Sequence, residues 1–329
     1  MINIQSQQFQ HTINNEISFK GAGLHSGKLC KLILSPAPIN YGIKFNYQKR
    51  DKNIAIPAYI ENVNSTVRGT NLTKDNISLF TIEHLLSAIY GLGIDNLKIN
   101  ISSNELPILD GSSKIYVEKI KNIGIKTQSR KRKEFIVKNI ISFKSSKGIQ
   151  FYLIPCDDYK FTYYLNYKNI NELKQNFTVS LKNNNYEKSI SSSKTFCLLS
   201  ELLELYNNNL IKGGSLENAI VYIDKKINSN ELKQLGKIYN KKIKINYSNK
   251  ILNSVDFVFD NQAAKHKILD LIGDTSLLGI KIKGHLIAYQ SGHESNIEFI
   301  NYLKNTYLNK KLETKRKVKD MYNINQILD

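Results

Sequence analysis

Cysteine is scarce in this sequence, and long apolar runs are absent. The three cysteines, Cys30, Cys156 and Cys197, lie far apart, which argues against a disulfide framework and a CxxC zinc site. No stretch of about twenty apolar residues occurs, so no membrane-spanning helix is expected. Residues 1–19 lack the charged segment and apolar core of a secretory signal. Together these absences predict a protein of the reducing cytoplasm.

Arginine is also scarce, although the formal net charge is +19. Only five arginines occur, at positions 50, 68, 130, 132 and 316, so lysine carries nearly all of the excess. Lysine accompanies heavy use of Asn, Ile and Tyr, which indicates a base-composition bias of the gene. Because specific recognition of nucleic acids relies on arginine, we expect no nucleic-acid partner, although a basic binder remains an alternative. The charge would also favour an anionic substrate or a peripheral contact with the inner membrane face.

The length of 329 residues allows two domains. Residues 127–134 are polar, basic and without periodicity, and are predicted as a linker between domains at 1–126 and 135–305. A solvated hairpin tip within one domain is the alternative. Residues 83–99 and 266–282 share a pattern in which a histidine-bearing helix precedes a glycine and an alternating strand. This faint repeat favours two copies of an α+β unit that meet at one site.

The stretch at residues 264–279 is predicted as a helix, with Asn261 suited to cap its start and Gly279 its end. Its apolar residues share one face, and His266, Asp270 and Asp274 lie at i, i+4 and i+8 on another. A histidine and a carboxylate one turn apart can bind one metal ion. For this pattern alone, a solvated polar face is the more frequent explanation.

A second histidine-bearing helix is predicted at residues 81–90, with Thr81 as its cap. Glu83 and His84 are adjacent near its start. Two histidines and one aspartate make a three-ligand metal site with an open position for water. Glu83 could then serve as general base, and His293, in a glycine-flanked loop, as proton donor. Asp274 would keep His293 protonated, because a neighbouring carboxylate raises an imidazole pKa.

Short motifs accompany this constellation: GLHSGK, TIEHLLSAIYGLGIDN, ELPILDGSS, KTF, GGSLENAIV, HKILDLIGD and SGH. In this order they resemble the UDP-3-O-acyl-N-acetylglucosamine deacetylase (LpxC) family. The resemblance implies an α+β fold of two similar domains, each a β-sheet layered with helices, with the active site at their interface. It also implies a zinc-dependent amide hydrolase that removes acetate from a UDP-sugar, the committed step of lipid A biosynthesis.

The resemblance further implies a role for each residue of the metal site. The ligands, for Zn²⁺ with Fe²⁺ as the alternative metal, would be His84, His266 and Asp270. Glu83 would be the general base. His293 would be the general acid or the cation that stabilises the tetrahedral intermediate, with Asp274 behind it.

Substrate contacts are implied in the same way. Thr195 would hydrogen-bond the developing oxyanion, and Lys267 and His25 would contact the polar parts of the substrate. The acyl chain would occupy a passage, in an insert near residues 196–220, lined by Phe196, Leu198 and Leu202. From the residues alone, ordinary core packing explains the leucines equally well.

A lysine-rich insertion near residues 228–253 and the basic tail 306–329 resemble a subgroup fused to a hydroxyacyl-ACP dehydratase. The final residues, KVKDMYNINQILD, resemble the fusion linker, so we expect a remnant of a lost or separately encoded dehydratase and no dehydratase activity. We expect a monomer. Another two-His-one-carboxylate metalloenzyme, such as a non-haem iron oxygenase, remains an alternative. The glutamate beside a ligand and the additional histidine favour hydrolysis.

Overall fold

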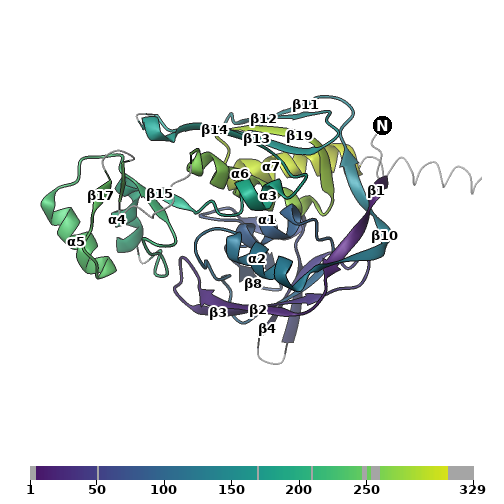
Figure 1. Cartoon of the computed structure of the whole chain (residues 1–329), viewed down its shortest axis with the longest axis horizontal. Helices are drawn as coiled ribbons and strands as arrows, with labels where there is room; N and C mark the ends of the chain where they lie inside the picture. Colours follow the sequence, from purple (N-terminus) through teal and green to yellow (C-terminus); the bar gives the residue numbers. More distant parts are fainter. Residues whose placement is uncertain are drawn as a thin grey trace, which may run out of the picture.

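Two similar β-sheets enclose a layer of helices in this computed structural model (Figure 1). The structure describes residues 5–49, 52–168, 170–208, 210–246, 250–252 and 260–309. Most of the basic tail 306–329, including the expected fusion remnant, lies outside these residues, as do parts of the insertion predicted at 228–253. Among the described helices, none is long and apolar enough to cross a membrane.

The first half of the chain forms a five-stranded sheet. In order across the sheet, its strands are β2 (Ile17–Ala22), β3 (Leu29–Pro36), β9 (Leu97–Ile101), β4 (Ile43–Lys49) and β5 (Lys52–Pro57). Neighbouring strands are antiparallel except β9 and β4, which are parallel. Apolar side chains alternate along β3 and β9, so Leu32, Leu34 and Ile99 are buried on one face.

The second half repeats this arrangement. In the corresponding order, its strands are β11 (Ile141–Lys144), β12 (Gln150–Ile154), β19 (Lys281–Tyr289), β13 (Tyr159–Asn166) and β14 (Lys174–Ser180). Again all neighbours are antiparallel except one pair, β19 and β13. The α+β class expected from the sequence is confirmed, and the faint sequence repeat corresponds to a duplicated sheet topology.

A long ribbon connects the two halves. Strand β10 (Ile125–Ile136) pairs antiparallel with β1 (Gln5–Ile13) and, at its end, parallel with β19. Residues 127–134, expected to be an irregular linker, therefore lie within a β-strand. Most of β10 faces solvent, which explains why its sequence is polar and without an apolar period. The domain boundaries drawn at 126 and 135 stay a prediction.

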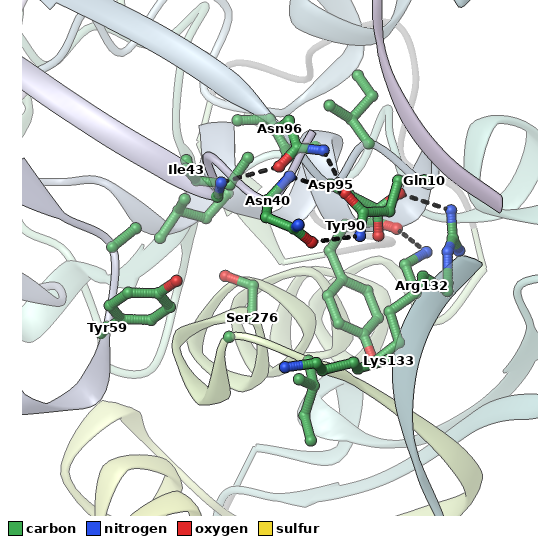
Figure 2. A pocket seen from close by; sticks show the side chains of 18 residues that line it. Gln10, Asn40, Ile43, Tyr59, Tyr90, Asp95, Asn96, Arg132, Lys133 and Ser276 are labelled. Carbon is green, nitrogen blue, oxygen red and sulfur yellow. Dashed lines mark hydrogen bonds and ion pairs between the residues drawn. The ribbon is translucent and has the colours of Figure 1, made fainter. Parts of the chain in front are cut away.

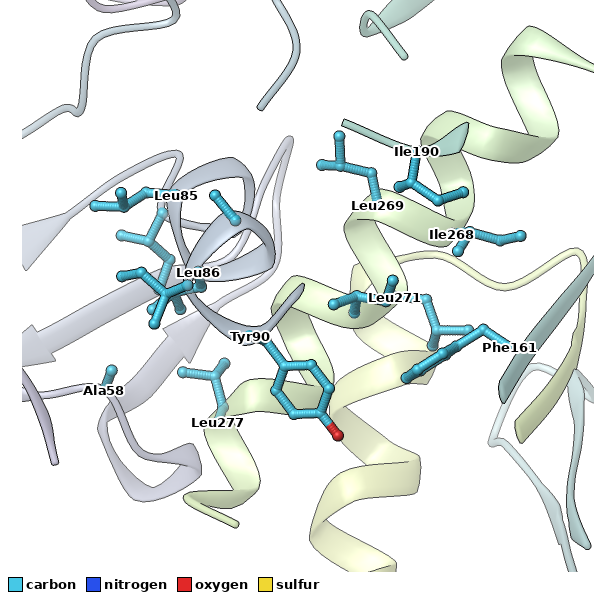
Figure 3. Packing of buried hydrophobic residues seen from close by; sticks show 14 of the residues in the cluster. Ala58, Leu85, Leu86, Tyr90, Phe161, Ile190, Ile268, Leu269, Leu271 and Leu277 are labelled. Carbon is cyan, nitrogen blue, oxygen red and sulfur yellow. The ribbon is translucent and has the colours of Figure 1, made fainter. Parts of the chain in front are cut away.

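Helices fill the space between the two sheets. Their bounds are α1 (Glu83–Gly91), α2 (Lys114–Ile123), α3 (Asn185–Ser189), α6 (Gln262–Thr275) and α7 (His293–Leu303). Helices α1 and α6 pack against each other, and Leu86, Tyr90 and Leu271 belong to one buried cluster (Figure 3). Gly273 permits the close approach, because a Cβ there would lie 2.3 Å from the carbonyl oxygen of Glu83. The core is therefore continuous across both halves.

Each half carries an insert at the same place, between its fourth sheet strand along the chain, β5 or β14, and its central helix, α1 or α6. The first insert is a small sheet of β6 (Val63–Ser65), β7 (Asn71–Lys74) and β8 (Ile77–Leu79). The second contains β15 (Phe196–Leu198), α4 (Leu199–Asn207), β16 (Ile220–Tyr222), α5 (Ser229–Tyr239), β17 (Ile245–Asn246) and β18 (Ile251–Leu252). It forms the lobe at the left of Figure 1 and has its own apolar cluster, which includes Leu202 and Leu235. Helix α5 and strands β17 and β18 lie within the insertion predicted at 228–253.

Two predicted helix caps are wrong. Thr81 adopts a left-handed conformation, with φ 57°, and its hydroxyl donates to Glu105 at 3.3 Å, so α1 begins later, at Glu83. Asn261 precedes α6 with φ 58° and makes no side-chain capping hydrogen bond. Gly279 does end the helical segment, with φ 75°, a conformation that glycine adopts without strain.

The interpretation of the α6 stripe as a solvated polar face is also wrong. His266 and Asp270 are each 3% exposed, and Asp274 is 0% exposed. Helix α6 is enclosed by α1, α7 and strands β13 and β14, so no face of its central turns reaches solvent. Polar groups buried in this way require partners, which points to a site.

Candidate active site

The first turn of α1 meets the middle of α6. Glu83 and His84 are the first two residues of α1, and His266 and Asp270 are one turn apart on α6. Because Gly273 lets the backbones of the two helices approach, side chains from both reach the same point. All four of these side chains are buried.

His84, His266 and Asp270 form a cluster suited to hold a metal ion. One ligand atom from each lies within 4.8 Å of the others. Asp270 Oδ1 is 3.4 Å from His266 Nε2 and 3.9 Å from His84 Nε2. The backbone carbonyl of Ser193 lies 3.0 Å from His266 Nδ1, so it accepts an N–H there and leaves the Nε2 lone pair facing Asp270. A lone pair this close to a carboxylate oxygen calls for a cation between them.

The charge states of these groups fit a metal site as well. Burial and the neighbouring His266 lower the pKa of His84 to about 3, and burial lowers that of His266. Burial alone would raise the pKa of Asp270, but His266 and Lys267 hold it well below its usual range. The site therefore offers two neutral imidazoles and a carboxylate, the forms that bind metals. His84 Nδ1 has no hydrogen-bond partner among the described residues.

Glu83 lies beside this cluster and has the properties of a general base. Burial, reinforced by Asp270 and Asp274, raises its pKa to about 7, although His293 opposes the shift. The backbone N–H of Thr70 donates to Glu83 Oε2 at 3.1 Å and orients the carboxylate. A carboxylate with a pKa near neutrality can both take and release a proton.

His293, at the start of α7, forms a tight pair with Asp274. His293 Nδ1 lies 2.9 Å from Asp274 Oδ2. Burial lowers the pKa of His293, but the Asp274 carboxylate outweighs it and raises the pKa to about 9. Asp274 also accepts hydrogen bonds from the Thr70 hydroxyl and from Asn296 Nδ2, the latter at 2.8 Å. His293 is therefore held as a cation with its other nitrogen free.

A cavity of about 250 Å³ joins these groups. Its lining includes nine of the residues expected from the sequence: Glu83, His84, His266, Asp270, His293, Thr195, Lys267, His25, Phe196. Leu202 lines its apolar part, together with residues of the lobe. Asp274 lies behind His293 and does not line the cavity. Leu198 is not brought to it, because on strand β15 this side chain packs against the main core.

Several side chains in the cavity are held in place by neighbours. The Thr195 N–H donates to Gly111 at 2.8 Å, and its carbonyl accepts from Ile220 at 2.9 Å. Lys267 Nζ donates to Asp270 Oδ2 at 3.0 Å and lies 5.8 Å from the ring centre of Phe196. These contacts place a hydroxyl and an ammonium beside the metal cluster.

Some residues that complete the site were not recognisable from the sequence. Thr70 and Asn296 hold Asp274, and Arg68 and Tyr239 line the cavity. Glu105 accepts the backbone N–H groups of His25 at 2.8 Å and Ser26 at 2.7 Å, which fixes the turn that carries His25. The ELPILDGSS motif contains Glu105 and was the one available signal; the other four lie in no pattern that marks a site.

Comparison with known proteins agrees with this geometry. The family model described as UDP-3-O-acyl N-acetylglycosamine deacetylase matches residues 10–243 and 228–305. The chain belongs to this family. The two matched ranges cover most of the chain, including every residue of the metal cluster, so the resemblance seen in the motifs is confirmed.

Relatives from this deacetylase family fall into two kinds. The bifunctional enzyme LpxC/FabZ of Chlorobaculum tepidum is 36% identical over 302 residues, which cover 90% of this chain and 64% of that protein. The UDP-3-O-acyl-N-acetylglucosamine deacetylases of Syntrophus aciditrophicus and Teredinibacter turnerae are 32% and 34% identical, and the matches cover 86% and 89% of their lengths. The chain thus spans less than two thirds of the bifunctional relatives and most of the single-function ones.

Proposed function

We propose that this chain is a metal-dependent amide hydrolase that removes acetate from UDP-3-O-acyl-N-acetylglucosamine in lipid A biosynthesis. The observation that carries the proposal is the convergence, around one cavity, of His84, His266 and Asp270 with a buried glutamate and a histidine cation. Family membership supports it, since relatives named for this activity share about a third of their residues with the chain.

The resident metal is proposed to be Zn²⁺, with Fe²⁺ as the alternative, because imidazole and carboxylate ligands suit both ions. When bound, such an ion would lower the pKa of a water molecule and polarise a carbonyl group. His84, His266 and Asp270 would hold it. Lys267 donates to Asp270 Oδ2, so Oδ1, the oxygen nearer to both histidines, is the one proposed to bind the metal.

Proton transfers are assigned to the two groups that flank the metal cluster. Glu83 takes the proton of the attacking water, for which its pKa near 7 is suited. His293, kept cationic by Asp274, stabilises the negative charge on the tetrahedral intermediate and donates a proton to the leaving amine. The Thr195 hydroxyl donates to the developing oxyanion.

The apolar part of the cavity is proposed to receive the acyl chain. Leu202, Leu205 and Val221 of the lobe line it, together with Phe196, whose ring centre lies 6.1 Å from that of His266. Leu198, expected in this passage, is replaced in that role by Cys197 on the opposite face of β15. The polar residues His25 and Lys267 lie nearer the metal cluster and would contact the sugar nucleotide.

Acetate release from UDP-3-O-acyl-N-acetylglucosamine by the purified chain, with metal content measured in parallel, tests the proposal. We expect Glu83→Gln and His293→Ala each to lower kcat by about a hundred- to ten-thousandfold with the metal retained. Glu118→Gln and His285→Ala serve as matched controls, because Glu118 is exposed on α2 and His285 lies on β19 away from the cavity.

Two outcomes would contradict it. A bound metal without acetate release would make the substrate assignment wrong and call for a test of oxygen consumption, which an iron oxygenase would show. A chain without metal, even after incubation with zinc, would make the ligand assignment wrong.

We further infer that the chain acts as a cytoplasmic monomer, with the lysine-rich lobe as the region for any peripheral membrane contact. Lysines of the lobe such as Lys226, Lys233 and Lys242 are exposed or half-buried on its surface. Such contact would be weak and salt-sensitive. Binding to DNA that survives physiological salt would favour the nucleic-acid alternative.

A further inference from the structure

A second cavity, of about 330 Å³, lies at the other end of helices α1 and α6 from the metal cluster (Figure 2). Tyr90, in the last turn of α1, and Ser276, just after α6, both line it. Strands β10 and β19 contribute Arg132 and Lys281, so both halves of the molecule form its wall. None of its lining residues lines the catalytic cavity.

Positive charge gathers in this cavity. Arg132 is 4% exposed, and its Nε has no hydrogen-bond partner among the described residues. Arg132 Nη2 and Lys281 Nζ point toward the same place, because a Cβ added to Gly93 would lie 3.7 Å from each of them. Lys133 adds a third cation to the lining, whereas Asp95 is the one acidic residue there. A buried guanidinium and a half-buried ammonium thus lie close together.

The existing contacts leave a net positive charge in this lining. Asp95 Oδ2 accepts from Arg132 Nη2 at 2.9 Å and from the His11 N–H at 2.8 Å, so it is already shared. Arg132 Nη2 also donates to the carbonyl of Gly93 at 2.7 Å, but the lining holds three cations and one carboxylate and so keeps a net positive charge. Lys281 Nζ donates to the carbonyl of Tyr90 at 2.7 Å, a neutral acceptor. Burial and the neighbouring Arg132 lower the pKa of Lys281 to about 7, although the carboxylates of Asp95 and Glu134 oppose the shift. An anion beside Lys281 would restore the balance.

Part of the remaining lining is polar and suited to hydroxyl groups, beside aliphatic residues such as Ile89 and Ile94. Asn40 Oδ1 accepts from Gln10 Nε2 at 2.9 Å, which leaves the amide N–H₂ of Asn40 to donate elsewhere. Figure 2 shows the Tyr59 and Ser276 hydroxyls across from this amide. The volume lies at the lower end of the range for small-molecule sites and exceeds what a bare phosphate needs.

We propose that this cavity binds a small phosphorylated sugar, with its phosphate against Lys281, Arg132 and Lys133 and its hydroxyls against Asn40, Tyr59 and Ser276. The three cations come from two neighbouring strands, and the hydroxyl-binding groups come from the opposite wall. Arginine and lysine together suit a phosphate, because guanidinium donates in a fork and ammonium acts as a compact charge. The site is separate from the proposed deacetylase chemistry and does not depend on it.

Calorimetric titration of the full chain tests the proposal with three probes: glucose 6-phosphate, inorganic phosphate and glucose. We expect glucose 6-phosphate to bind most tightly, with one molecule per chain. Lys281→Met should weaken its binding about tenfold or more, because one charge-assisted hydrogen bond is lost. Lys283→Met is the matched control, since Lys283 lies two residues along β19 and pairs with Asp157 on the outer surface.

Lys133→Met keeps the test decisive if Lys281→Met fails to fold, because Lys133 is exposed and its replacement leaves the core intact. A severalfold loss of affinity is expected for it. The proposal is overturned if glucose 6-phosphate does not bind at millimolar concentration, or if neither variant alters its binding. Equal affinity for inorganic phosphate and glucose 6-phosphate would reject the sugar part of the proposal.

Discussion

The two halves of this molecule share one sheet topology, yet their central helices carry different chemistry. In α6, His266 is followed at i+4 and i+8 by Asp270 and Asp274. The same positions after His84 of the first half hold Ala88 and Leu92, which have no ligand atoms. The first half therefore supplies the proposed base and one proposed metal ligand, whereas the second supplies two proposed ligands and the histidine–aspartate pair.

The inserts of the two halves also bring different groups to the site. The first half has a three-stranded sheet that brings Thr70 to Glu83 and Asp274. The second has a lobe with its own apolar cluster, which lines the non-polar part of the cavity. The repeated sheet topology thus determines where α1 and α6 cross. The residues that differ between the halves determine the chemistry proposed at that crossing.

The largest expected effect comes from removing the carboxylate that only α6 provides. Asp270→Ala should abolish acetate release and lower metal content far below one ion per chain, since it leaves two ligands. Metal analysis of the purified variant beside the wild type checks this. Ala88→Ser, at the corresponding position of α1, should keep both metal and activity; a loss of metal there would show that the halves are less distinct than proposed.

The crossing itself can be disturbed without changing a ligand. Gly273→Ala places a methyl group 2.3 Å from the Glu83 carbonyl, so α1 and α6 must move apart. We expect the free energy of unfolding to fall by about 1–3 kcal/mol. Metal affinity should also fall, because His84 lies on α1 and would move with it. Denaturant unfolding and metal titration measure the two effects. Gly292→Ala is the control, since nothing lies within 4 Å of its added Cβ, and equal behaviour of both variants would refute the role given to Gly273.

The pH profile tests the pair in the second half. His293 must hold its proton to act as acid, so activity is present below its pKa of about 9 and is lost as the pH rises through that value. Asp274→Asn removes the charge that raises the pKa, so the alkaline limb of kcat/KM should move to lower pH, with about tenfold lower activity at neutral pH. An alkaline limb that stays in place would exclude His293 as its origin.

The smallest effect on catalysis is expected from the core of the lobe. Leu235 is fully buried in the lobe cluster, on the α5 side. Leu235→Ala should lower the free energy of unfolding of the lobe by about 2–5 kcal/mol, while the stability of the two sheets stays unchanged. Hydrogen exchange should then rise in α4 and α5 alone, and KM for long acyl chains should increase more than kcat falls. Uniform exchange over the whole chain would mean that the lobe is not a separate packing unit.

The two helices that carry the proposed site were predicted more accurately than the structure around them. The i, i+4 spacing of His266 and Asp270 needed only a helix, and the helix is present. Thr81 was misjudged as a cap because its left-handed conformation follows from the Glu105 contact, made to a residue 24 positions away. Strand β10 was missed because both faces of a solvated ribbon are polar, which removes the apolar alternation that marks a strand.

By itself, the sequence determined which ligand types exist, their spacing along each helix and the repeat of helix and strand, because these depend on local periodicity. Only the tertiary structure decided that His84 meets Asp270, that Thr70 holds Asp274 across 204 positions of the chain, and that Leu198 turns away from the cavity. It alone also brought Arg132 and Lys281 together at the second cavity. Contacts between distant segments arise from the packing of whole helices and strands. The periodicity of a sequence shows which face of an element is buried, but it does not show which other element covers that face.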